Sequence, residues 1–122
     1  MRRSLAAASL VLATLALATA CGDEEKPDDT GGSTEPKVIK VTFVGDSVTP
    51  SGDRVEVATG QDVELEITAD QPGEIHVHST PEQELEYEAG ESTLTIEGID
   101  QPSIVDVESH SLDKVIVQLE VH

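Results

Sequence analysis

The chain has 122 residues and carries 25 acidic against 7 basic side chains, which gives a formal net charge of −18 at pH 7. This charge repels nucleic acid and anionic lipid headgroups, so it argues against a nucleic-acid-binding function. The single cysteine excludes an intramolecular disulfide, and one Phe, one Tyr and no Trp leave too few rings for a base- or sugar-stacking surface.

Residues 1–20, MRRSLAAASLVLATLALATA, have the layout of a secretory signal peptide. Two arginines precede an apolar stretch rich in Ala and Leu, and small residues lead from it to Cys21. The stretch from Leu5 to Ala20 is short for a comfortable bilayer span, which needs about 20 apolar residues. We therefore expect residues 1–20 to be removed during export.

The residues at the predicted cleavage point, LATAC, resemble the lipobox of bacterial lipoproteins. The match departs in one respect, because Leu17 stands four positions before Cys21 rather than the usual three. The resemblance implies cleavage before Cys21 and lipidation of that residue, with acyl chains holding the protein on the extracytoplasmic side of a bacterial cell membrane. Ordinary secretion with a free cysteine is the alternative.

Residues 21–36 are expected to form the lipidated cysteine and a flexible acidic tether. The segment after Cys21, GDEEKPDDTGGSTEP, is acidic and rich in Gly and Pro, and it has no apolar side chain able to anchor it. Such segments bury too little surface to offset the entropy cost of ordering. The remaining residues, 37–122, are expected to form one small domain.

Apolar and polar residues alternate through most of residues 37–122, the pattern of half-buried strands. In DVELEIT, the clearest example, Val63, Leu65 and Ile67 alternate with polar side chains. Turn-forming segments separate about eight such runs, and none has a helical pattern, which predicts an all-β antiparallel sandwich or barrel. The runs are VIKVTFVG, RVEVAT, DVELEIT, EIHVHS, ELEYEA, TLTIEG, IVDVES and KVIVQLEV.

The order of these segments over residues 37–122 resembles the cupredoxin family. KVIKVTFVG and VEVATGQDVELEITAD precede the histidine strand GEIHVHS, and EYEAGESTLTIEG, QPSIVDVESH and KVIVQLEV follow it. The chain is most similar to a bacterial exported group of cupredoxin-like domains with a His-Val-His strand. The resemblance implies a Greek-key β-sandwich of about seven or eight strands.

The expected fold does not imply a blue-copper function. A blue-copper site needs a Cys thiolate with two His, often with a distant Met. Beyond Cys21 the chain has neither Cys nor Met, and the thiolate position near the end of VDVESH carries Ser109 or His110. The composition therefore excludes a blue-copper electron carrier.

Three histidines form the candidate metal site. His76 and His78 are expected to share a face, because alternate residues of a strand point the same way. The cupredoxin resemblance places the loop of His110 beside this strand and makes it the expected third ligand. Three imidazoles suit Cu(II) or Zn²⁺, and Glu74 on the same face can add a carboxylate. His122, the C-terminal residue, is left out of the set.

The same region has an interpretation without metal. Polar residues at 74, 76 and 78 also match the solvent side of a half-buried strand. Glutamates at every second position from 82 to 88 share one face. The favoured interpretation is a solvated face that protects an edge strand from aggregation, and a cation site on these carboxylates is the alternative. The chain has no nucleophile elbow and no phosphate-binding glycine loop, so enzyme activity is not expected.

Together these features predict a membrane-anchored, extracytoplasmic binding module that is monomeric and not an enzyme. Cu(II) or Zn²⁺ is the candidate ligand, and the sequence identifies no protein partner. The alternative is a metal-free, immunoglobulin-like module that displays a protein-interaction surface. Stoichiometric metal uptake distinguishes the two.

Overall fold

The structure is a computed structural model, and it describes residues 35–122. The predicted signal peptide, the predicted lipidation of Cys21 and the predicted tether as far as residue 34 lie outside the described residues. Within residues 35–122, no helix has the length and apolar character needed to cross a lipid bilayer.

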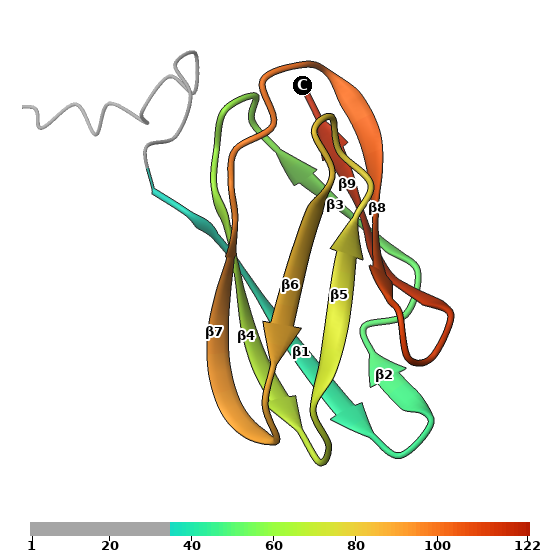
Figure 1. The fold of residues 1–122 in the computed structure, drawn as a ribbon. Coiled ribbons are helices and arrows are strands. Elements are labelled where there is room, and N and C mark those ends of the chain that lie inside the picture. Colours follow the sequence, from blue (N-terminus) through green and yellow to red (C-terminus); the bar gives the residue numbers. More distant parts are fainter. Residues whose placement is uncertain (1–34) are drawn as a thin grey trace, which may run out of the picture.

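In the described part of the chain, nine strands form two sheets that pack on each other (Figure 1). The four-stranded sheet has the order β2-β1-β4-β7, and the five-stranded sheet has the order β3-β9-β8-β5-β6. The strands are β1 (Lys37–Val44), β2 (Ser47–Thr49), β3 (Asp53–Val57), β4 (Val63–Ala69), β5 (Gly73–Val77), β6 (Gln83–Tyr87), β7 (Gly90–Ile96), β8 (Ser103–Ser109) and β9 (Lys114–Val121).

The predicted all-β sandwich is confirmed, and each of the eight predicted runs overlaps a strand. The additional strand, β2, lies in GDSVTPSGD, a segment whose composition predicts a turn. It has three residues, and Val48 is its one buried side chain. A strand this short shows no alternation in the sequence, so the turn residues around it dominate the pattern.

The pairing directions differ from a purely antiparallel arrangement. β1 pairs in parallel with β4, and β3 pairs in parallel with β9, whereas the other paired strands are antiparallel. The chain leaves the four-stranded sheet to form β3 and then returns to it as β4. Because of this crossover, β4 runs in the same direction as β1. Alternation in sequence identifies strands but carries no information on their direction in the sheet.

The inward faces of the two sheets form one core, built mainly from Val, Ile and Leu. Leu65 in β4, Ile75 in β5 and Leu119 in β9 each have 0% of their surface exposed. The chain's two aromatic residues, Phe43 and Tyr87, stack with ring centroids 4.8 Å apart. Because the apolar side of each strand is buried here, the intervening polar side chains are directed outward.

β6 forms one edge of the five-stranded sheet and lies beside β5 (Figure 1). The glutamates at 82, 84, 86 and 88 are all exposed, in agreement with the prediction of a solvated face on an edge strand. Charged side chains along an edge oppose pairing with the strand of another molecule. Two of them, Glu84 and Glu86, pair with His76 and Glu74 and add negative charge beside the outward side chains of β5.

Candidate functional site

β5 presents two potential ligands on the outer face of the five-stranded sheet. Ile75 and Val77 point into the core and are fully buried, so Glu74 and His76 point outward and are half-buried. β5 lies between β6 and β8, and the register places His76 opposite Glu84 on one side and Glu108 on the other. His76 therefore lies between two carboxylate-bearing positions.

The third potential ligand comes from the turn that follows β8. β8 ends at Ser109, which pairs with Ile75 of β5, and His110 comes next. The backbone amide of His110 donates a hydrogen bond to the carbonyl oxygen of Glu74 at 3.0 Å. The His110 and His76 rings stack with centroids 4.7 Å apart and an interplanar angle of 14°. The pairing of β5 with β8 thus brings together two histidines that are 34 positions apart in the sequence.

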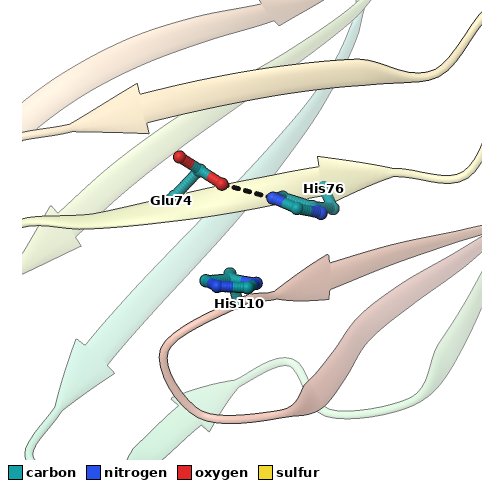
Figure 2. Close-up of side chains that lie close together, drawn as sticks. All are labelled: Glu74, His76 and His110. Atoms are coloured by element: carbon teal, nitrogen blue, oxygen red, sulfur yellow. Dashed lines mark hydrogen bonds and ion pairs between the residues drawn. The ribbon is translucent and has the colours of Figure 1, made fainter.

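Glu74, His76 and His110 form a compact ligand group, called here the His76–His110 cluster (Figure 2). One ligand atom from each of the three residues lies within 4.8 Å of those from the other two. The Nε2 atom of His76 makes a short hydrogen bond with a carboxylate oxygen of Glu74. Two imidazoles and a carboxylate thus converge from two neighbouring segments of the sheet.

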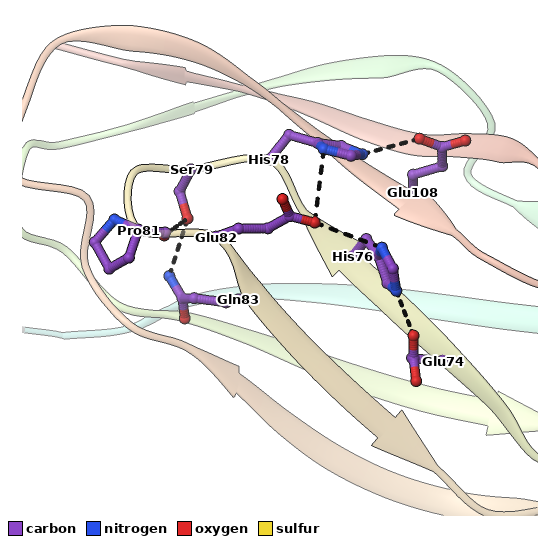
Figure 3. Close-up of polar contacts among 8 residues, drawn as sticks. All are labelled: Glu74, His76, His78, Ser79, Pro81, Glu82, Gln83 and Glu108. Atoms are coloured by element: carbon purple, nitrogen blue, oxygen red, sulfur yellow. Dashed lines mark hydrogen bonds and ion pairs between the residues drawn. The ribbon is translucent and has the colours of Figure 1, made fainter.

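Glu82 and Glu84 form a second ligand group with His76, again with ligand atoms within 4.8 Å of one another. This group uses the other side of the ring, where the Nδ1 atom of His76 is 3.5 Å from a carboxylate oxygen of Glu82 (Figure 3). Both glutamates are exposed, in contrast to the half-buried Glu74. His76 is therefore the residue that the two groups share.

His78, the remaining predicted ligand, has carboxylate partners of its own. It lies one residue beyond the end of β5, and its Nε2 atom is 3.0 Å from an oxygen of Glu108 (Figure 3). Its Nδ1 atom is 4.0 Å from Glu82, and its ring centroid is 6.4 Å from that of His76. Among the described residues it belongs to neither ligand group. The ligand role predicted for His78 stays a prediction.

From the sequence, Glu74 was expected only as an additional ligand, Glu82 and Glu84 only as part of an alternative cation site, and Glu108 was not expected as a ligand. The alternation within β5 was a sufficient signal for Glu74, because it shares a face with His76. Glu84 and Glu108 lie opposite His76 only through the register of β5 with its neighbours. That register joins segments distant in sequence, and no pattern within a single strand reports it.

The charge around His76 favours its protonated form. The hydrogen bond with Glu74 raises the pKa of His76 above its ordinary value of 6.5. Partial burial opposes this shift, and the negative charges of Glu74, Glu84 and Glu82 add to it. A cation bound by the Nε2 atom of His76 would therefore compete with a proton for that nitrogen.

We expect an NMR titration of the metal-free protein to give a pKa for His76 above 6.5, and Glu74→Gln to lower it. A raised pKa in the folded state means that protonation of His76 stabilises the fold below the unfolded-state pKa. This contribution is lost as the pH rises through the folded-state pKa. The stability advantage of the wild type over His76→Gln should therefore shrink from pH 6 to pH 9.

The matched control for this titration is Glu66→Gln, which removes one exposed carboxylate from the four-stranded sheet. It should leave the pKa of His76 unchanged. An equal pKa in wild type and Glu74→Gln would show that Glu74 does not set the charge state of the cluster.

Comparisons with known proteins identify a fold but no family. No protein-family model matches the chain, and no curated protein matches it in sequence. Among solved structures, it is similar to a multi-copper oxidase from Pediococcus acidilactici, with 12% identity and a TM-score of 0.51 over 75% of this chain. The chain spans only 27% of that oxidase. It is also similar to dithionite-reduced auracyanin from the photosynthetic bacterium Roseiflexus castenholzii, with 14% identity and a TM-score of 0.48, over 75% of this chain and 99% of auracyanin.

At these identities the likeness shows the fold alone, and that fold is a cupredoxin-like β-sandwich. The side chains do not fit blue copper. Neither Cys nor Met occurs after Cys21, and the end of β8 carries Ser109, which is fully buried, followed by His110. Nitrogen and oxygen donors without a thiolate suit Cu(II) or Zn²⁺ instead.

Proposed function

We propose that the protein is an extracytoplasmic binding module that captures Cu(II) or Zn²⁺ through the His76–His110 cluster. The observation that carries the proposal is the convergence of Glu74, His76 and His110 within 4.8 Å, from two segments held together by the sheet. Lipidation at Cys21 and anchoring to a bacterial cell membrane are part of the proposal, and they rest on the LATAC motif.

The donor set defines the kind of ion. Zn²⁺ binds imidazole nitrogen and carboxylate oxygen, commonly with tetrahedral geometry, and three protein ligands leave one position for water. Cu(II) also favours nitrogen and oxygen donors, whereas Cu(I) is selected by thiolate and thioether sulfur. The cluster therefore favours capture of a divalent ion over electron transfer.

The surroundings of the cluster support cation capture in two further ways. Glu84 and Glu108 flank His76 in the register and add negative charge, which raises the local concentration of cations. The hydrogen bond that Glu74 accepts from His76 also fixes the orientation of the His76 ring before a metal arrives. Since a metal must displace the proton of His76, affinity should rise with pH through the pKa of that residue.

A metal-free interaction module is the second candidate, and one observation favours it. The ion pairs of His76 with Glu74 and Glu82, and of His78 with Glu108, satisfy both imidazoles without a metal. In that case the outer face of the sheet serves as a charged contact surface. In both candidates the module is proposed to be monomeric, without enzyme activity and without affinity for nucleic acid.

Titration calorimetry of residues 22–122 with Zn²⁺ and Cu(II) tests the proposal. Omitting Cys21 removes a thiol that would otherwise bind these ions. The expected result is one-to-one binding of at least one of the two ions. Mg²⁺ provides the control, because it prefers oxygen ligands and reports binding to the acidic surface in general. If neither Zn²⁺ nor Cu(II) gives larger binding heats than Mg²⁺, metal capture is rejected and the interaction module is favoured.

A further inference from the structure

Tyr87 lies on the inner side of the sheet, beneath the turn that carries His110. It is the last residue of β6, its ring is buried, and it stacks on Phe43 of the opposite sheet with an interplanar angle of 16°. Tyr87 and Ser111 line the same hollow, to which Phe43 and Leu112 also contribute. The ring of an edge-strand residue therefore reaches the β8–β9 turn from inside the fold.

Gly73 makes this position of the ring possible. It pairs directly with Tyr87 across β5 and β6. A Cβ atom at residue 73 would lie 2.6 Å from the Cζ atom of Tyr87 and would overlap its hydroxyl oxygen. Any side chain at this position would displace the ring. The glycine thus leaves the space through which Tyr87 extends across β5 towards β8.

The hydroxyl of Tyr87 meets the two serines on either side of His110. Burial raises the pKa of the Tyr87 phenol, and hydrogen bonding with Ser111 and Ser109 offsets part of this shift. Ser109 is fully buried, and its hydroxyl lies 3.4 Å from that of Ser111. A buried hydroxyl group requires such partners. These three side chains thus form one polar contact that runs from the core, at Ser109 and Tyr87, to the exposed Ser111.

We propose that Tyr87 is a positioning residue for the metal site. Gly73 leaves room for the Tyr87 ring, and the Tyr87 hydroxyl holds Ser109 and Ser111. This contact keeps His110 stacked on His76. The inference rests on the proposed function of the His76–His110 cluster. The ring of His110 is exposed and stacks on that of His76, so its position depends on the turn that carries it. A fixed turn reduces the entropy lost when the ring is ordered by a metal, and this raises affinity.

The test compares wild type, Tyr87→Phe and Ile96→Val as whole chains in mild detergent, all with Cys21→Ser. Tyr87→Phe removes the hydroxyl and keeps the stacked ring. Ile96→Val is the control for stability, because Ile96 is fully buried in β7 of the other sheet. For Tyr87→Phe we expect the Kd for Zn²⁺ to rise about tenfold. For Ile96→Val we expect the Kd for Zn²⁺ to stay within about twofold of the wild-type value, although this variant loses about as much thermal stability as Tyr87→Phe.

A second measurement does not require metal. Hydrogen exchange of the His110 amide, which is bonded to the Glu74 carbonyl, should be faster in metal-free Tyr87→Phe than in Ile96→Val. Unchanged Kd and unchanged exchange in Tyr87→Phe would overturn the positioning role. If wild type binds no metal, the proposed function fails and so does a positioning role at a metal site. The exchange result would then show only whether Tyr87 orders the turn.

Discussion

Replacement of His76 by alanine is expected to weaken Zn²⁺ and Cu(II) binding by roughly 100-fold or more, or about 2.8 kcal/mol. His76 belongs to both ligand groups, and its two ring nitrogens face Glu74 on one side and Glu82 on the other. Its loss therefore leaves no imidazole between the carboxylates of β5 and β6. Calorimetric titration of the folded variant measures the effect directly.

Three histidine variants make the result specific to the cluster. His110→Ala should cause a loss similar to that of His76→Ala, because both rings belong to the same group. His78→Ala should have a smaller effect, since His78 is paired with Glu108 and lies outside both groups. His122→Ala removes a histidine at the chain end and should leave affinity unchanged. Equal affinity in His76→Ala and His122→Ala would mean that any bound metal sits elsewhere.

Replacement of Leu65 by alanine is expected to lower the free energy of unfolding by about 2–5 kcal/mol. Leu65 lies in β4 between β1 and β7, has 0% of its surface exposed and pairs with Ile39 and Leu94. Removing its side-chain methyl groups leaves a cavity that the two packed sheets can close only in part. Urea unfolding followed by circular dichroism gives the free energy of both proteins.

Val38→Ala is the matched control for this core position. Val38 lies in the neighbouring strand β1, on the outer face, with 48% of its surface exposed. Its truncation should change the free energy of unfolding by less than about 0.5 kcal/mol. Equal effects at the two positions would contradict the assignment of Leu65 to a sealed core between the sheets.

Most strands were predictable from sequence because they bury a single face. β9 is an exception, since the adjacent Ile116 and Val117 are both fully buried. In β4, Val63, Leu65 and Ile67 are buried while Glu66 is exposed, so the alternation of the sequence is also the alternation of the structure. The parallel pairing of β1 with β4 was not predictable in this way. It depends on the path of the chain between the sheets, which leaves no periodic signal.

The candidate site was predictable only in part. Period-two geometry was sufficient to direct His76 outward beside Glu74. It did not foresee that the ring of His78, one residue beyond the end of β5, lies 3.0 Å from Glu108. The place of His110 came from a family resemblance, because the contact of its turn with β5 depends on pairing between strands distant in sequence.

The most direct test of the central claim is the position of a bound ion. Crystals of the protein grown with one equivalent of Zn²⁺ and measured at the zinc absorption edge locate the metal by its anomalous signal. The account predicts a single strong peak bounded by Glu74, His76 and His110. A peak confined to the exposed glutamates of β6, or no peak near His76 in a crystal that contains zinc, would contradict it.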